Sequence, residues 1–388
     1  MKDAKNVNHQ FFDRLNLGLL KKWWIDVDKI NFLIITCMMV FGVMMIASTS
    51  PILAKKLSLE STYFLKKQSV FAVLGFFLII FLSILDYKKI KLISIAGLAG
   101  AVILLMAVLI FGSEIKGSKR WLSIFGINIQ PSEFAKTFFV VVNAFILTKF
   151  HDRKFFLNYS LSLALYLSMV ALLVLQPDFG MVFTFTMIWA AQLFLFGLPM
   201  LLVFSLSIAG IIGFVFVYRN FPHVQDRIMR FLDMGSSNYQ AERSLDAFVS
   251  GSFFGKGPTN GFVKDFIPDA HTDFIFAVIA EEFGIISCSF ILLIFLYLIT
   301  RILIRASSEK NMVRYLALCG LAAQFTIQII VNVGVSLSVL PTKGMTLPLI
   351  SYGGSSMIAS SICFGFILAL TKKKYHDETD YGNIKSHL

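Results

Sequence analysis

The sequence carries few charged residues and few of the sequence patterns that soluble enzymes use. Asp, Glu, Lys and Arg make up only 15% of the 388 residues, whereas 57% are hydrophobic and 41 are Phe. An ordinary soluble domain has about 25% charged residues. P-loop, GxSxG and HExxH sequences are also absent, which argues against an ATPase carried on this chain. The composition therefore indicates a membrane protein.

Cysteine is scarce as well. The four cysteines are Cys37, Cys288, Cys319 and Cys363; all fall in apolar stretches and none has CxxC spacing. Because disulfide frameworks and zinc sites both show characteristic cysteine spacings, we expect neither in this chain.

Long apolar runs are abundant, and each is long enough to cross about 30 Å of hydrocarbon as a helix. Those near 132 and 179 are short or partly polar, so nine spans is the alternative to ten. The predicted fold class is an all-α integral membrane protein, a polytopic bundle of about ten transmembrane helices. The ten expected spans lie near residues 30–49, 68–86, 91–112, 132–149, 159–176, 179–197, 199–218, 273–300, 312–336 and 350–371.

Basic residues predict the orientation, because Lys and Arg near helix ends resist translocation. With the N-terminus inside, most of them face the cytoplasm, although four lysines between 55 and 67 do not. Both termini are then cytoplasmic: a segment at 1–28 and a tail at 372–388 flank a membrane domain at 29–371, which includes one large extracytoplasmic loop at 219–272. Basic loop ends at an anionic membrane surface explain the net charge of +12 without a nucleic acid partner.

Three polar segments interrupt the apolar pattern, and this topology places all of them on the extracytoplasmic side. The first is GSKRWLSIFGINIQPSEFAK, residues 117–136, which predicts a hairpin-like or re-entrant loop followed by a helix start. Lys119 and Arg120 in this short loop are candidates for anion binding. Lys136 lies one helical turn inside the membrane, where the alternative to a functional role is an ion pair with Glu133 on the same helix face.

The second segment is the long loop, in which YQAERSLDAF at 239–248 predicts a short amphipathic helix. It continues into GSFFGKGPTNGF at 251–262, a glycine-rich stretch whose backbone N–H groups could approach a phosphate. Such turns are common, so this pattern alone is weak evidence for a phosphate site.

The third segment is PTKGMTLPLISYGGSS at 341–356, where prolines and glycines break a continuous helix and Lys343 stands among them. Broken backbone at membrane depth is tolerated where it is buried in protein or lines a wet cavity. Just before it, Gln324, Gln328 and Asn332 recur every four residues, which predicts a polar seam facing other helices.

The stretch PDAHTDFIFAVIAEEFG at 268–284 concentrates carboxylates at the start of the eighth expected helix. Asp273 there is either an N-cap or a general base, because a partly desolvated carboxylate suits proton abstraction. Glu281 and Glu282 lie deeper, where carboxylates usually need a positive partner; Lys136 and Lys343 are the candidates. Basic groups and carboxylates in one cavity suit a phosphate-bearing, lipid-linked substrate.

These stretches, in this order and with LQPDFG at 175–180, resemble the SEDS family of bacterial shape, elongation, division and sporulation proteins. PTKG before LPLISYGGSS is similar to the division branch, FtsW, more than to the elongation branch, RodA, which stays as the second choice. Ser336 and Ser338 depart from the usual family pattern. The resemblance covers residues of about 30 to 371.

The resemblance implies a peptidoglycan glycosyltransferase of the bacterial inner membrane that polymerises lipid II at the division septum. It implies Asp273 as the catalytic residue and Arg120, Lys136 and Asp265 as substrate-handling residues. We add Lys119, Lys343 and Glu282 as substrate-binding candidates. The implied partner is a class B penicillin-binding transpeptidase, FtsI-like, together with other division proteins and membrane lipid.

Undecaprenyl pyrophosphate would leave from the donor glycan, so no nucleotide cofactor is needed. Positive residues or a divalent cation, Mg or Mn, would stabilise its charge, and the sequence does not identify a metal site. Two alternatives stay open: a flippase for lipid II that uses a buried polar pathway, and a division scaffold without chemistry.

Overall fold

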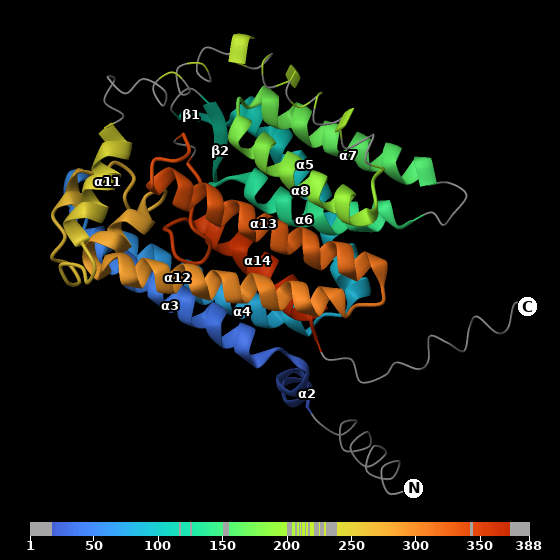
Figure 1. Ribbon diagram of the computed structural model, residues 1–388, viewed down its shortest axis with the longest axis horizontal. Helices are drawn as coiled ribbons and strands as arrows, with labels where there is room; N and C mark the ends of the chain where they lie inside the picture. Colours follow the sequence, from blue (N-terminus) through green and yellow to red (C-terminus); the bar gives the residue numbers. More distant parts are fainter. Residues whose placement is uncertain are drawn as a thin grey trace, which may run out of the picture.

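The computed structural model describes residues 18–115, 118–124, 126–149, 155–199, 239–341 and 344–372, with scattered positions between 204 and 229. Its described part is a bundle of helices with a small sheet at one end (Figure 1). The helices are α2 (Leu19–Asp26), α3 (Lys29–Lys56), α4 (Tyr63–Ile84), α5 (Tyr87–Phe111), α6 (Pro131–Leu147), α7 (Phe155–Leu175), α8 (Phe179–Phe196), α11 (Tyr239–Gly251), the 3₁₀ helix η1 (Val263–Phe266), α12 (Ile275–Ser307), α13 (Met312–Ser336) and α14 (Gly354–Leu370).

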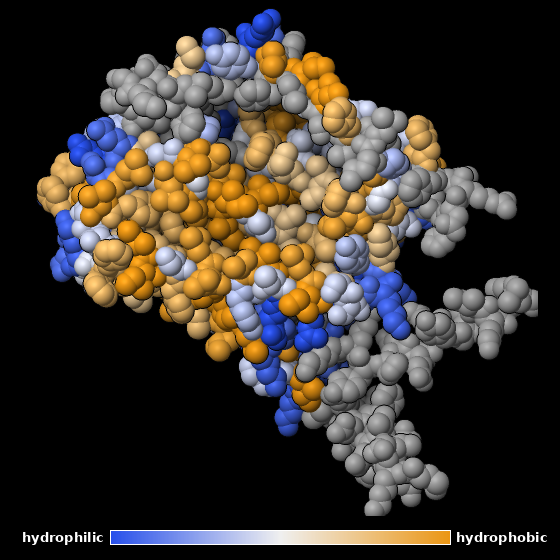
Figure 2. All heavy atoms as spheres, in the orientation of Figure 1, coloured by the Kyte–Doolittle hydropathy of each residue, from blue (hydrophilic) through white to orange (hydrophobic). Residues whose placement is uncertain are grey.

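Seven of the described helices are long and apolar enough to cross a membrane, and α14 is a shorter apolar helix. Every predicted span except 199–218 coincides with a described helix, and 199–218 lies outside the continuously described residues. Apolar atoms form a broad band across the bundle, with hydrophilic atoms at the two ends of the band (Figure 2). The prediction of an all-α polytopic membrane protein is confirmed.

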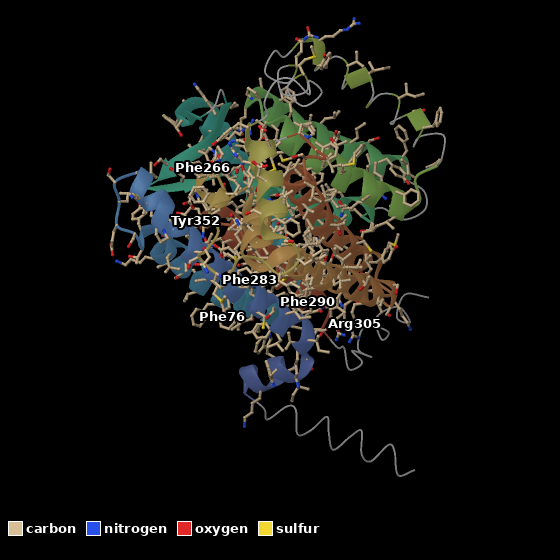
Figure 3. All side chains as sticks on the ribbon, turned by 60° about the vertical axis from the view of Figure 1, so that its left-hand side comes forward. Phe76, Phe266, Phe283, Phe290, Arg305 and Tyr352 are labelled. Carbon is tan, nitrogen blue, oxygen red and sulfur yellow. The ribbon has the colours of Figure 1, made fainter. Side chains whose placement is uncertain are left out.

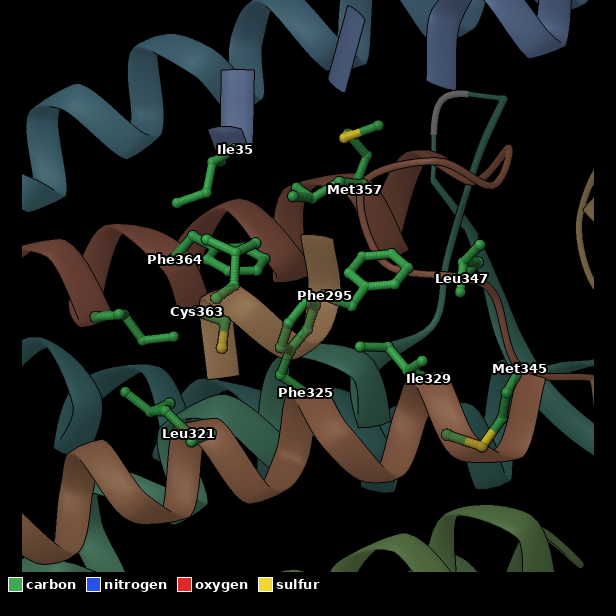
Figure 4. Packing of buried hydrophobic residues seen from close by; sticks show 14 of the residues in the cluster. Ile35, Phe295, Leu321, Phe325, Ile329, Met345, Leu347, Met357, Cys363 and Phe364 are labelled. Atoms are coloured by element: carbon green, nitrogen blue, oxygen red, sulfur yellow. The ribbon is translucent and has the colours of Figure 1, made fainter. Parts of the chain in front are cut away.

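The interior is built around α13 and α6, which are buried along most of their length. Phe325 of α13 meets Phe295 of α12 and Phe364 of α14 edge to face, with ring centroids 5.4 Å and 4.9 Å apart (Figure 4). This geometry suits the quadrupoles of aromatic rings. Helices α4 and α14 approach closely because Gly365 faces Leu82, whose Cβ would lie 2.8 Å from a Cβ added to the glycine.

The sheet consists of β1 (Ser113–Ile115), β2 (Ser118–Ile124) and β3 (Ile127–Ile129) in antiparallel order. It follows α5 and leads directly into α6, so the predicted hairpin-like loop is confirmed as a pair of hairpins. We call this end of the bundle the sheet end. Because the helices alternate in direction, the turn before α12 and the segment 344–353 also lie there.

Helix α12 contains a break at Gly284, where φ is 79° and ψ is 173°. The N–H groups after the break, from Ile285 and Ile286, donate to the carbonyls of Ser252 and Phe253 at 3.0 and 3.3 Å. The carbonyls before the break, of Glu281 and Glu282, accept from the N–H groups of Lys256 and Gly257 at 3.0 and 2.9 Å. The loop after α11 therefore completes the hydrogen bonds that the broken helix lacks.

We expect Gly284→Ala to destabilise the protein, because alanine rarely adopts a positive φ and its Cβ would lie 2.2 Å from the Phe253 carbonyl oxygen. Strain of this kind costs about 1–3 kcal/mol, and the collision adds to it. Gly100→Ala in α5 is the matched control, since nothing lies within 4 Å of its new Cβ. Thermal unfolding in detergent should show a lower midpoint for the first variant only; equal midpoints would contradict the strain at Gly284.

Candidate active site

Asp273 lies in the turn that precedes α12, and it is not the N-cap of that helix. The helix begins at Ile275, and its N-cap residue is Phe274, which makes no side-chain cap hydrogen bond. The Asp273 N–H donates to the carbonyl of Asp269 at 3.1 Å, and Asp269 has a left-handed φ of 57°. Asp269 therefore shapes the turn, and Asp273 is partly exposed and lies one residue before the N-cap.

The broken segment 344–353 lies against this turn. A Cβ added to Gly344, which has a φ of +68°, would lie 3.4 Å from Oδ2 of Asp273. The Tyr352 N–H donates to the His271 carbonyl at 2.8 Å, and the Ser351 hydroxyl donates to the Thr272 carbonyl at 2.6 Å. Irregular backbone is thus buried against protein at this depth, as the prolines and glycines predicted.

The polar seam of α13 holds both elements together. Asn332, which is 1% exposed, donates through Nδ2 to the carbonyl of Asp273 at 2.9 Å and to that of Met345 at 2.6 Å. One turn earlier, Gln328 donates to the carbonyl of Thr346 at 3.0 Å. The prediction that this face contacts other helices and buried groups is confirmed. The seam fixes the main chain at Asp273.

Lys136 is 2% exposed and lies deep in α6. Its Nζ donates to Oε2 of Glu133 at 2.7 Å and to Oε1 of Gln328 at 2.9 Å. The ion pair on one helix face, considered as the alternative to a functional role, is therefore present. Gln328 also connects Lys136 to the segment 344–353, so the buried cation belongs to the same network as the backbone of Asp273.

Arg120 extends from β2 to the turn between α7 and α8. Its Nη2 donates to the carbonyl of Pro177 at 2.9 Å, and its Nη1 lies 3.6 Å from Oδ1 of Asp178. Asp178 in turn caps α8 by accepting the Met181 N–H at 3.2 Å. Sequence reasoning missed Asp178 as the partner of Arg120. The neighbouring Lys119 is exposed.

The carboxylate of Glu281 is surrounded by backbone N–H groups. Its Oε1 accepts from Phe262 and Val263 at 2.7 Å each, and its Oε2 accepts from Lys264 at 2.8 Å. The glycine-rich stretch was considered as a phosphate cradle. In the structure, the protein's own carboxylate accepts from Phe262, the last residue of that stretch, and from the first two residues of η1.

Glu282 pairs with Lys264, and Ser48 of α3 bonds to both. Both charged side chains are buried, at 1% and 4% exposure. The prediction that Lys136 is the partner of these carboxylates was wrong, because Lys136 pairs with Glu133. The other expected partner, Lys343, lies outside the described residues. A substrate-binding role for Glu282 stays a prediction, as does that of Asp265, which follows Lys264 in η1 and is partly exposed.

We expect Lys264→Met to be strongly destabilising, because it leaves the Glu282 carboxylate buried without its cation. Loss of one partner of a buried pair costs about 3–5 kcal/mol, whereas replacing both is often close to neutral. The double variant Lys264→Met, Glu282→Gln should therefore unfold at a higher temperature than the single variant. A double variant less stable than Lys264→Met alone would contradict the pairing.

An aromatic cluster supports the turn from the side of α4. The ring of His271 lies 5.8 Å from that of Phe64 and 5.3 Å from that of Tyr352, and the latter two rings are 5.4 Å apart. Burial lowers the pKa of His271 to about 4, against the opposing effect of the Asp269 carboxylate. Burial also raises the pKa of Tyr352 to about 12. Both side chains are neutral near pH ~7.

The pKa of His271 predicts a loss of stability in mild acid. The unfolded chain binds a proton near the ordinary pKa of 6.5, whereas the folded chain binds it only near 4, so stability falls as the pH drops through this window. His271→Phe, which keeps an aromatic ring, should remove about 2 kcal/mol of the pH dependence between pH ~7 and ~5. Unfolding midpoints of both proteins at the two pH values provide the measurement; identical shifts would refute the prediction.

Within the described residues, no group of three or more His, Cys, Asp or Glu side chains could hold a metal ion. The four cysteines are free thiols. What the sheet end offers instead is a partly exposed carboxylate whose main chain is held from two sides, and a basic residue, Arg120, at the same end. Such a carboxylate can accept a proton from a bound hydroxyl.

Comparisons with known proteins agree on the family. The family described as cell cycle proteins, FtsW, RodA and SpoVE, matches residues 28–376. The chain is 32% identical over 375 residues to a probable peptidoglycan glycosyltransferase FtsW of Caulobacter vibrioides, covering 96% of this chain and 95% of that protein. It is 34% identical over 369 residues to a protein of the same name in Geobacter sulfurreducens, covering 92% and 99%.

Solved structures show the same fold. A chain in a peptidoglycan synthase complex, studied for its structural coordination of polymerization and crosslinking, superposes with a TM-score of 0.75 at 28% identity and covers 91% of this chain and 100% of that chain. The rod shape determining protein RodA of Thermus thermophilus superposes with a TM-score of 0.67 at 27% identity, covering 91% and 99%. This chain belongs to the family of cell cycle proteins that comprises FtsW, RodA and SpoVE.

Proposed function

We propose that this protein is a peptidoglycan glycosyltransferase that polymerises lipid II at the division septum. The observation that carries the proposal is the placement of Asp273. Its main chain is held by Asn332 and by Asp269, its side chain is partly exposed, and it faces the segment at Gly344. The FtsW name of the related proteins supports the division role over the elongation role.

In the proposed reaction, the Asp273 carboxylate takes the proton of the acceptor sugar's 4-hydroxyl as that oxygen attacks the anomeric carbon of the donor chain. The bond from this carbon to the pyrophosphate breaks, and undecaprenyl pyrophosphate leaves with the bonding electrons. One displacement converts the α-linked donor to a β-linked polymer. Lys119 and Lys343, or a divalent cation, would stabilise the charge on the leaving group.

The guanidinium of Arg120 already has protein acceptors at Pro177 and Asp178. We therefore assign it first to holding the turn before α8. Within α8, the Thr184 hydroxyl donates to Sδ of Met345 at 3.8 Å. Lys136 is likewise paired within the protein. Both residues then act mainly by positioning the protein groups that they contact, while the exposed Lys119 remains available to the pyrophosphate.

The sheet end would face the extracytoplasmic side of the bacterial inner membrane, where lipid II is polymerised, with both termini cytoplasmic. A class B penicillin-binding transpeptidase would work beside it, since the structural relative is part of a peptidoglycan synthase complex. Basic residues near the opposite end support this orientation, because Lys and Arg favour the cytoplasmic face.

A flippase for lipid II is the competing function. It would use a buried polar pathway through Lys136, Glu281 and Glu282. In the structure, the Glu281 carboxylate accepts hydrogen bonds from backbone N–H groups, and the Glu282 carboxylate forms an ion pair with Lys264. Only Lys136, paired with Glu133, then remains of that pathway, so the geometry favours the transferase.

Asp273→Asn should abolish polymerisation, because an amide cannot accept the hydroxyl proton as a carboxylate does. The purified protein with its transpeptidase partner would be given lipid II, and glycan chains would be separated on a gel. We expect a loss of about 100-fold or more in rate. Asp246→Asn on α11, where the side chain is 46% exposed and pairs with Arg243, is the control and should leave the rate unchanged.

Wild-type glycan levels from Asp273→Asn would refute the assignment of the base. Unfolding midpoints of both variants show whether a loss of activity reflects misfolding. Transport of lipid II by reconstituted Asp273→Asn, without polymerisation by the wild type, would instead support the flippase.

A further inference from the structure

A group of exposed apolar side chains lies at the sheet end, outside the helical bundle. They come from α11, η1 and the loop between them, and we call them the Phe patch: Val249, Phe253, Phe254, Phe262 and Phe266, with exposures of 81%, 66%, 84%, 65% and 46%. The rings of Phe262 and Phe266 are in contact, with centroids 5.1 Å apart. A gathering of exposed apolar side chains of this kind marks an interaction site with a membrane or another molecule.

The interior contacts of α11 do not use this face. Its buried residues are Ser244, Ala247 and Gly251, and the Ser244 hydroxyl donates to the Ser336 carbonyl at 2.6 Å. Small residues let α11 lie close to α12, since a Cβ on Gly251 would lie 1.9 Å from the Ala280 carbonyl oxygen. The helix is therefore held by small and polar groups together with Phe248, whose ring lies 5.9 Å from that of Phe276. Val249 and the phenylalanines of the patch are left facing outward.

The Phe patch is continuous with the membrane-facing surface of α12. The Ile286 N–H donates to the Phe253 carbonyl at 3.3 Å, which places Phe253 beside the first residues after the break. From there, α12 presents Ile285, Ile286 and Phe290 with exposures of 43%, 52% and 62%. Figure 3 shows Phe266, Phe283 and Phe290 following one another down the molecule. Residues 275–282 before the break are buried, so the patch lies where the outward-facing apolar surface of α12 begins.

This continuity decides the kind of partner. Aromatic and apolar side chains at the end of a span lie at the boundary between acyl chains and headgroups, with polar residues beside them in the headgroup layer. The exposed Lys256 stands between Phe254 and Phe262 in sequence, as expected for contact with anionic headgroups. Thr259 and Asn260 are exposed at the tip of the same loop.

We infer that the Phe patch is a membrane-interface anchor, which inserts into the lipid leaflet at the sheet end. The anchor holds η1, and with it the turn from Asp265 to Asp273, at the depth of the lipid headgroups. If the proposed function holds, on which this last consequence rests, the carboxylates meet a lipid-linked substrate at the level where its phosphates lie.

The test uses the full chain in lipid nanodiscs and a fluorescent probe on one cysteine. Cys37, the exposed cysteine, is first replaced by serine; the other three are buried. Phe254→Cys and, as matched control on the same loop, Thr259→Cys are then labelled with an environment-sensitive dye. Phe290→Cys in the span serves as the positive control. Nitroxide lipids, labelled either near the headgroup or near the chain end, act as quenchers.

We expect a blue-shifted emission at position 254 and quenching by the shallow nitroxide about twofold or more stronger than at position 259. Position 290 should be quenched by a deeper nitroxide. Water-like emission and equal, weak quenching at 254 and 259 would overturn the inference. Protection of position 254 that arises only when the transpeptidase is added would overturn it too, in favour of a protein partner.

Unfolding midpoints close to that of Cys37→Ser confirm that the labelled proteins are folded, as expected for a site that is 84% exposed. The readout does not depend on glycan synthesis. A protein that polymerises lipid II but leaves the patch in water would refute only the anchor, and the reverse result would refute only the enzyme.

Discussion

Backbone polar groups inside a membrane need partners within the protein, and the break in α12 brings this constraint to one place. At Gly284 the helix cannot continue its own series of backbone hydrogen bonds. The loop from Ser252 to Gly257 supplies backbone donors and acceptors to the helix on both sides of the break. The same loop runs on into η1, whose N–H groups surround the Glu281 carboxylate. One inserted segment therefore closes the helix and fixes the start of the chain that leads to Asp273.

Helix α13 meets the same constraint for the segment 344–353. Successive polar residues on one of its faces supply side-chain amides, and these donate to the carbonyls of Met345 and Thr346. Asn332 also donates to the Asp273 carbonyl. The residue that completes the hydrogen bonds of the segment 344–353 therefore also positions the turn before α12. The candidate active site is thus located by main-chain hydrogen bonds from a rigid, buried helix, which is a more exact support than a loop can give itself.

The features of this arrangement that depend on the length of apolar runs or on a regular spacing of residues could be predicted from the sequence. Apolar length predicted the spans, and the four-residue spacing from Gln324 to Asn332 predicted the seam. Pairings between distant segments could not be predicted, because no periodicity relates Lys264 to Glu282 or Arg120 to Asp178. Lys136 illustrates the difference: its partner Glu133 on the same helix was foreseen, and its partner Gln328 on another helix was not.

The carboxylates at 268–284 differ in what holds their charge. Glu281 is 0% exposed and accepts from three N–H groups, and Glu282 is 1% exposed and paired with Lys264; both stabilise the fold around the break. Asp273 is the one of these three that solvent reaches, and the N-cap position belongs to Phe274. A structural carboxylate needs its negative charge satisfied by the protein, whereas a general base must meet an incoming hydroxyl. The burial of the two glutamates therefore assigns them to the support of the candidate site, and Asp273 stays the predicted general base.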